Sequence, residues 1–334
     1  MPCVSWKSNE VARLSITRTE LNVTIIPLEP KHILEMTAIA DRAMEFDYVD
    51  EMLIREKTLS ARDFDPDLAI GAKKAGRLAG FAMGAIGKKS DDVTYGYVRL
   101  LAVDPSAQRQ GIGTALLYEM EKRLAARGAE VMAIMDCGTN YFMPGVDFRY
   151  TEGFCFLAKN GYERTGANHN MICEIGPNHW PDIDSRTAAL AEEGFQIRRA
   201  RKADAPAVYE FLDKNWAAWH CEVENALENE PPTVYICLSG KNKVVAFAGY
   251  QGNNKSLSWF GPMGTDPALR GKGVGSLLLQ LCLRELARQG FSDAIIPWVG
   301  PVGFYARYCE AEMDRCFYAY RKSLKNPAGT SRKK

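Results

Sequence analysis

Residues 104–117 have the sequence DPSAQRQGIGTALL, and residues 266–279 repeat its pattern as DPALRGKGVGSLLL. Each copy follows an apolar stretch and passes through two glycines into apolar residues at helical spacing. Proline after aspartate ends a strand, and the glycines allow a tight turn into a helix. The repeat therefore predicts a strand, a Gly-rich turn and a long helix, used twice in one chain.

The two halves share one order of predicted elements around this turn. A short strand, an amphipathic helix and three strands precede it, and the long helix, a further strand, a shorter helix and a last strand follow. We therefore expect an α/β protein with two tandem domains. The expected divisions are an N-terminal extension (1–21), a first domain (22–176), a linker (177–194), a second domain (195–325) and a C-terminal tail (326–334).

The composition excludes several functional classes. The chain has 334 residues, of which 46% are hydrophobic, so each of two domains can bury a core. A formal net charge of +1 argues against binding nucleic acid by neutralising phosphates. No apolar run approaches the length of about 18 residues that a membrane span needs, and the first residues lack a secretory signal, so we expect a cytoplasmic protein. The four histidines form no HExxH or HxH pattern, and no metal is expected.

The turn suits a pyrophosphate group. The first N–H groups of a helix point outward with the positive end of the helix dipole behind them. A phosphate loop of the GxxxxGK[ST] type is absent, and a dinucleotide fingerprint would need a glycine where Leu116 and Leu278 stand. The expected cofactor-binding residues are Gln108, Arg109, Gln110, Gly111, Ile112, Gly113 and Thr114 in the first copy, and Arg270, Gly271, Lys272, Gly273, Val274, Gly275 and Ser276 in the second.

Both halves resemble the GNAT acetyltransferase family, in which a Q/R-x-x-G-x-G/A segment holds the pyrophosphate of acetyl-CoA. The resemblance covers about 22–175 and 195–325. It implies, for each half, a mixed and mostly antiparallel sheet that splays between two strands, with acetyl-CoA in the splay. It also implies that backbone groups of the strand before the turn bind this cofactor, at Leu101 and Val103 and at Met263 and Thr265. One such N–H would polarise the thioester carbonyl.

The two copies differ at the position of the proton donor. GNAT domains commonly protonate the departing thiolate from a tyrosine in a Phe-Tyr pair, and residues 300–305, GPVGFY, supply that pair. We therefore expect Tyr305 to be the general acid. The matching stretch of the first copy, FCFLAKNGY at 154–162, has Leu157 in this place. The first copy is then expected to bind cofactor without catalysis, or to use another donor such as Tyr150.

Candidates for binding the acceptor occur in both halves. The insertion at 140–150, NYFMPGVDFRY, offers Tyr141, Asp147, Arg149 and Tyr150, although a structural plug between the domains is an equal alternative. In the second half, the resemblance places the acceptor near the two tryptophans that follow the first helix. These tryptophans are Trp216 and Trp219.

Three carboxylates are candidates for the general base. They are Glu222, Glu224 and Asp293, with water as the alternative. Aromatic faces beside carboxylates suit an amino sugar, whose C–H face stacks while its amine and hydroxyls bind acceptors. The loops at 144–150 and 261–267 also resemble tandem GNAT enzymes that acetylate glucosamine and glucosaminides.

We therefore expect an acetyl-CoA-dependent N-acetyltransferase that acts on a primary amine of a small molecule, with direct transfer in the second domain. Two alternatives stay open, namely acetylation of a protein N-terminus or lysine, and a non-catalytic sensor of acetyl-CoA. Neither nucleic acid nor a membrane is an expected partner. The sequence does not indicate an oligomeric state.

Overall fold

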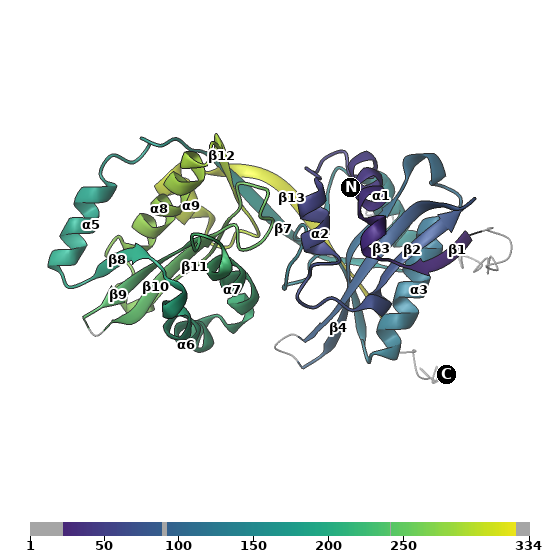
Figure 1. The fold of residues 1–334 in the computed structure, drawn as a ribbon, viewed down its shortest axis with the longest axis horizontal. Coiled ribbons are helices and arrows are strands. Elements are labelled where there is room, and N and C mark those ends of the chain that lie inside the picture. Colours follow the sequence, from purple (N-terminus) through teal and green to yellow (C-terminus); the bar gives the residue numbers. More distant parts are fainter. Residues whose placement is uncertain (1–22, 89–91, 241, 325–334) are drawn as a thin grey trace, which may run out of the picture.

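The computed structural model describes residues 23–88, 92–240 and 242–324 (Figure 1). The predicted extension (1–21) and tail (326–334) lie outside the described residues. The first half contains, in chain order, β1 (Val23–Pro27), α1 (Ile33–Ala43), α2 (Glu51–Lys57), β2 (Ala69–Lys74), β3 (Arg77–Lys88), β4 (Thr94–Val103), α3 (Ile112–Ala126), β5 (Val131–Ile134), β6 (Val146–Asp147), α4 (Thr151–Lys159) and β7 (Glu163–Glu174).

The predicted linker contains helix α5 (Ile183–Glu192), which packs through Ile183 and Leu190 into the core of the second half. The second half then contains β8 (Gln196–Arg199), α6 (Ala205–Asn215), α7 (His220–Glu228), β9 (Val234–Ser239), β10 (Lys243–Tyr250), β11 (Phe260–Thr265), α8 (Val274–Arg288), β12 (Asp293–Ile296), α9 (Val302–Cys309) and β13 (Glu312–Ser323). Short 3-10 helices are η1 (Pro30–His32), η2 (Pro66–Leu68), η3 (Pro105–Ala107), η4 (Lys202–Asp204), η5 (Ala217–Trp219) and η6 (Pro267–Leu269).

The predicted fold class is confirmed, because helices cover the faces of a larger, mixed sheet and of a smaller sheet whose four strands are antiparallel. Neighbouring strands are mostly antiparallel, and β4 and β5 form a parallel pair. In the second half, alternation along β9 sends Tyr235 and Cys237 toward α8, while Val234 and Ile236 face α6 and α7. The sheet therefore separates two apolar layers, with α6 and α7 on one face and α8 and α9 on the other. No helix among the described residues is long and apolar enough to cross a membrane.

The last strands of the two halves join the halves into one body. The larger sheet has the order β1-β2-β3-β4-β5-β13-β7-β12, and the smaller sheet has the order β11-β10-β9-β8. β13, the last strand of the second half, pairs with β5 and β7 of the first half, and β7 pairs with β12 of the second. Figure 1 shows these two long strands between the halves. The repeat in the sequence does not predict this exchange, because alternation identifies a strand without identifying its neighbours.

Candidate active site

The Gly-rich turn has the same backbone geometry in both halves. The carboxylate of Asp266 accepts a hydrogen bond from the N–H two residues on (2.9 Å), and Gly273 has φ 81° directly before α8. Asp104 accepts the equivalent bond (3.0 Å), and Gly111 also has φ 81° before α3. Glycine adopts this left-handed conformation without strain. Both turns thus present the N-terminus of a long helix, which is a suitable site for a phosphate group.

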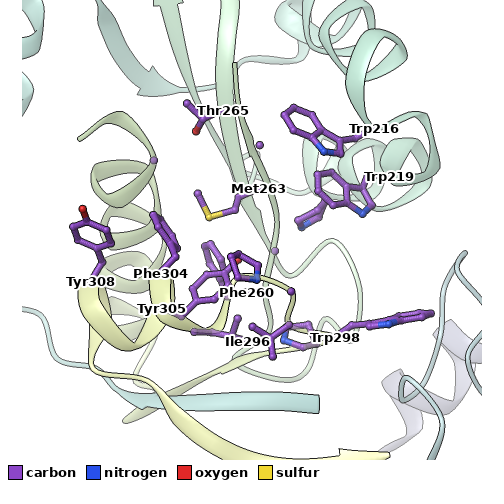
Figure 2. Close-up of a pocket in the computed structure, with 18 of the residues that line it drawn as sticks. Trp216, Trp219, Phe260, Met263, Thr265, Ile296, Trp298, Phe304, Tyr305 and Tyr308 are labelled. Atoms are coloured by element: carbon purple, nitrogen blue, oxygen red, sulfur yellow. The ribbon is translucent and has the colours of Figure 1, made fainter. Parts of the chain in front are cut away.

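The strands on either side of the second turn separate beside it. Trp259 pairs with Ile295, whose N–H donates to the carbonyl oxygen of Ser258 (2.9 Å), and from there β11 and β12 diverge as edges of different sheets. The gap between them opens into a cavity of about 940 Å³. Its walls come from both faces of the sheet, as Figure 2 shows, with Met263, Thr265, Phe304, Tyr305 and Tyr308 near α8 and α9, and with Trp216 and Trp219 on the opposite side. The cavity is also lined by Glu222 of α7 and by Tyr141 of the insertion in the first half.

The side of the cavity near α8 fits the predicted cofactor. Gly275 lies so close to β11 that a Cβ there would come within 3.2 Å of Thr265 Oγ1. That hydroxyl oxygen is buried and has no hydrogen-bond partner among the described residues, so a polar group of a bound molecule would satisfy it. The predicted cofactor residues that line this wall are Met263, Thr265, Arg270, Gly271, Gly273, Gly275 and Ser276. Lys272 and Val274 do not line it, and Lys272 forms an ion pair with Glu193 (3.3 Å).

The opposite side of the cavity is aromatic. Trp216 and Trp219 are stacked with ring centroids 5.4 Å apart, and Trp216 covers Gly264 so closely that any side chain there would collide with the ring. Tyr141, from the insertion in the first half, lies edge-on to Trp298 at 5.2 Å. In Figure 2 the Trp216–Trp219 pair lies across β11 from Phe304 and Tyr305. The cavity therefore passes through the sheet and connects two chemically different walls.

Two titratable side chains in these walls are strongly perturbed. Burial raises the pKa of Glu222 to about 7, although the Lys57 charge lowers it and Glu56 raises it further. Burial also raises the pKa of the Tyr305 phenol above its ordinary value, with a smaller contribution from Cys309. Among the described residues neither side-chain oxygen group has a hydrogen-bond partner. The cavity thus holds a carboxyl group that exchanges protons near neutral pH and a phenol that keeps its proton.

This environment means that ionisation of Glu222 lowers the free energy of unfolding. Its pKa is about 7 in the folded chain against 4.5 for an unperturbed glutamate, so stability from this group is present below pH 4.5 and is lost as pH rises through 7. Because glutamine does not ionise, Glu222→Gln should raise the free energy of unfolding at pH 8 by about 3 kcal/mol, and at pH 4.5 by well under 1 kcal/mol. Urea unfolding at both pH values measures this difference.

The matched control is Glu224→Gln, two residues along the same helix. The Glu224 side chain is 42% exposed and pairs with Arg62 at the surface (3.2 Å), so its replacement should change the free energy of unfolding by about 1 kcal/mol or less. An equal effect of Glu222→Gln at both pH values would contradict the raised pKa.

Several predicted site residues lie apart from this cavity. Glu224 faces solvent, and Asp293 accepts a hydrogen bond from Ser258 Oγ (3.2 Å) at the start of β12. Asp147, Arg149 and Tyr150 do not line the cavity either, and they belong to a network with Asp47 and Arg315. In that network Arg149 and Arg315 bind Asp147, and the Tyr150 hydroxyl donates to Asp47 (2.8 Å). This arrangement matches the plug between the halves, which the sequence offered as the alternative for the insertion.

Other residues of the cavity wall were missing from the site that the sequence predicts. Trp298 lies just after β12, adopts φ 47° and lines the cavity together with Phe260 and Tyr308. Two features of the sequence could have identified Trp298 as a site residue. It lies two residues before the GPVGFY segment, and it is one of the four tryptophans, out of six, that fall in the second half. Trp259 also lines the cavity, although its side chain is buried on the sheet.

The corresponding region of the first half has a different lining. A Cβ placed on Gly113 would lie 3.4 Å from the Phe156 ring, much as a Cβ on Gly275 would lie 3.7 Å from the Phe304 ring. Phe156 and Phe304 are therefore equivalent, and the next residue in the first half, the buried Leu157, takes the place of Tyr305. The turn of the first half is also occupied by internal contacts.

Those internal contacts involve the predicted cofactor residues of the first half. The Gln108 side chain donates to the carbonyl oxygen of Val103 (3.1 Å), and Gln110 accepts a hydrogen bond from Lys74. Leu101 packs against the core, and Arg109 has φ 61°, which is unusual for a residue with a side chain. A separate cavity of about 510 Å³ lies beside this turn, between it and α1.

The chain belongs to the acetyltransferase (GNAT) family, whose family model matches residues 33–144 and 196–309. Members of this family generally use acetyl-CoA, and the chain carries two GNAT domains in tandem. It is also similar to Acetyltransferase SG1711 of Sodalis glossinidius (strain morsitans), with 37% identity over 76 residues. That match spans 23% of this chain and half (50%) of the length of the curated relative.

Solved structures share the fold at low sequence identity. A glucosamine N-acetyltransferase region of a fungal multi-domain β-N-acetylglucosaminidase superposes with a TM-score of 0.72 and 18% identity, over 90% of this chain and 38% of that one. A tandem GNAT protein from the clavulanic acid biosynthesis pathway superposes with a TM-score of 0.62 and 15% identity, over 90% of this chain and 98% of that one. These similarities support the tandem arrangement of the fold.

Proposed function

We propose that this protein is an acetyl-CoA-dependent N-acetyltransferase whose second half transfers the acetyl group directly to a primary amine of a small molecule. The observation that carries the proposal is the cavity through the second sheet. It joins a glycine-lined helix N-terminus at one wall to a buried carboxyl group and stacked tryptophans at the other. Such a cavity brings a phosphate-bearing donor and an amine together while it excludes water.

Acetyl-CoA would supply a thioester, whose carbonyl carbon is open to attack by an amine. The N–H groups at the start of α8 would hold its pyrophosphate, with the Arg270 side chain beside them. Thr265 and Met263 of β11 would contact the part of the molecule that lies in the gap. The orphaned Thr265 hydroxyl fits this role, because it needs a polar partner.

Two side chains of the cavity would move the protons. The carboxylate of Glu222 accepts the proton that the amine nitrogen loses when the new C–N bond forms. Tyr305 Oη donates its proton to the sulfur atom when the C–S bond breaks. Both groups have suitable pKa values, since about half of Glu222 is ionised at pH 7 and the phenol of Tyr305 stays protonated throughout the neutral range. Leu157 provides no proton donor in the first half, so we assign the chemistry to the second.

An amino sugar is the acceptor that the second wall suits best. The stacked faces of Trp216 and Trp219 can pack on the C–H face of a pyranose, and the carboxyl group of Glu222 can bind its amine. A pair of stacked aromatic rings about the size of one sugar ring supports a small acceptor over a peptide. The glucosamine N-acetyltransferase region among the structural neighbours has the same fold, and glucosamine and its glycosides are therefore the first acceptors to test.

The decisive experiment measures thiol release from acetyl-CoA with a panel of acceptors. We expect release with glucosamine and with a glucosaminide that carries a free amine, together with an N-acetylated product in the mass spectrum. N-acetylglucosamine, which lacks the free amine, is the matched control and should give no release above the background. Release with peptides alone would replace the small-molecule acceptor by a peptide. Tight binding of acetyl-CoA with no release for any acceptor would favour the sensor.

A further inference from the structure

A buried polar cluster connects the first half of the chain to the second. Lys57, at the end of α2, is fully buried, and its ammonium group donates to Glu56 (2.7 Å), Asn140 (2.8 Å) and Asn253. Glu56 in turn accepts hydrogen bonds from the backbone N–H groups of Asn254 (2.8 Å) and Lys255 (2.9 Å). All three donors of the Lys57 ammonium therefore have partners, one of which belongs to the other half of the chain.

This cluster reaches the wall of the cavity through Tyr141. Asn253 Nδ2 donates to the carbonyl oxygen of Tyr141 (3.0 Å), and Asn254 Nδ2 donates to that of Phe142 (3.0 Å). The two asparagines lie in the connection between β10 and β11, and both are buried. The backbone that directly follows the Tyr141 side chain is thus bound to the second half at two carbonyl oxygens, which fixes the ring in the cavity wall beside Trp298.

The same connection packs against Glu222. Gly252 lies so close to α7 that a Cβ there would come within 2.3 Å of the Glu222 carbonyl oxygen. The charged groups that act on the Glu222 carboxyl are Lys57 and Glu56, both from α2. The other titratable neighbours are Tyr141 and the adjacent Cys221. The only positive charge that acts on Glu222 among the described residues comes from Lys57, in the other half of the chain.

We propose that Lys57 of the first half is a positioning residue for the acceptor site of the second half, where its hydrogen bonds to Asn140 and Asn253 hold Tyr141 in the wall that also carries Glu222. The charge of Lys57 also acts on the Glu222 carboxyl group from the other half of the chain. The first GNAT domain, which lacks the tyrosine donor, would then contribute to the reaction by completing the site of the second. A buried ammonium is a costly way to stabilise a fold, since an apolar residue of similar size often stabilises as well. A role in the cavity of the second half explains why the chain has the buried ammonium group of Lys57 at this position. The inference rests on the proposed role of Glu222.

The experiment removes the charge and follows the titration of Glu222. In Lys57→Gln, the neutral amide retains hydrogen-bonding groups, and we expect the pKa of Glu222 to rise by about one unit. The probe is carbon-13 NMR of glutamate carboxyl groups over pH 5–9, with the Glu222 signal assigned from its loss in Glu222→Gln. Acetyl transfer should show the same shift. kcat/KM for glucosamine should fall about fivefold at pH 7 and less than twofold at pH 9, as the ionised fraction dictates.

A second variant and a control keep the test sharp. Glu56→Gln/Lys57→Gln removes both buried charges, so it folds without an unpaired glutamate, and the pKa of Glu222 should still rise, because Lys57 acts on it more strongly than Glu56. Lys31→Gln, in an exposed ion pair of the first half with Glu29, should leave the titration unchanged.

The outcomes separate this inference from the proposed function. An unchanged pKa of Glu222 in both Lys57 variants would overturn the inference, as would a loss of kcat/KM that is equal at all pH values. The NMR titration needs no acceptor. A raised pKa in protein that acetylates no amine would therefore support the link between the halves while it contradicts the proposed activity.

Discussion

Replacement of Tyr305 by phenylalanine is expected to lower kcat for acetyl transfer about 100- to 1,000-fold, which lies within the usual contribution of a general acid. The phenol is only 7% exposed and lines the cavity, and burial holds its pKa above the ordinary value, so the proton stays on the oxygen at any pH of interest. Its hydroxyl has no partner among the described residues that would be lost on substitution. The ring contacts with Phe260 (6.1 Å) and Phe304 (5.2 Å) are retained in the variant.

Steady-state kinetics with acetyl-CoA and glucosamine give the result. Because the variant lacks one hydroxyl and keeps the walls, KM for acetyl-CoA should change less than twofold or so, while kcat falls. The matched control is Tyr308→Phe, which removes a second hydroxyl from the same cavity, one turn further along α9, and should retain most of the activity. A Tyr305→Phe enzyme with unchanged kcat would exclude this proton donor and direct attention to water.

The parts of the molecule that depend on local sequence could be predicted. The long helices expected after the two Gly-rich turns are found as Ile112–Ala126 and Val274–Arg288, because a left-handed glycine, capping and apolar spacing all act within a few residues. The fold class followed from the repeat and is confirmed. Local pattern also indicated a Phe-Tyr pair at the start of α9, which the structure has at the edge of the cavity.

The parts that depend on contacts between the halves could not be predicted. The sequence gives no reason to prefer Glu222 over Glu224. The two residues lie on opposite faces of α7, because side chains two positions apart in a helix point in nearly opposite directions. The packing of α7 against Gly252 decides that Glu222 is the buried one. No local pattern marks Lys57, which belongs to the other half of the chain. The partners of β7 and β13 were hidden for the same reason, since a strand's own sequence does not record which sheet it joins.

The exchange of strands between the halves predicts a second large effect, in which a substitution on β13 lowers the free energy of unfolding. Phe317 lies on β13, in the second half of the sequence, but its ring is 0% exposed in a core formed mainly by the first half, with Ile39, Phe81 and Phe142 among its members. Its strand pairs there with β6 and β7. Phe317→Ala should lower the free energy of unfolding by about 3–5 kcal/mol, through lost burial and the cavity it leaves. Met313→Ala, on the same strand but with a side chain 54% exposed, should change it by about 0.5 kcal/mol or less.

The two halves should lose stability together in this variant. β13 lies between β5 and β7, and β7 also pairs with β12, so the larger sheet continues from the damaged core to the edge of the cavity in the second half. Urea unfolding followed by tryptophan fluorescence reports mainly on the second half, where Trp216, Trp219, Trp259 and Trp298 lie, whereas circular dichroism reports on both halves. In Phe317→Ala both signals should shift to the same lower urea concentration. A fluorescence transition that stays at the wild-type midpoint while the dichroism transition shifts would mean that the halves unfold independently. The exchanged strands would then fix the relative position of the two halves without linking their free energies of unfolding.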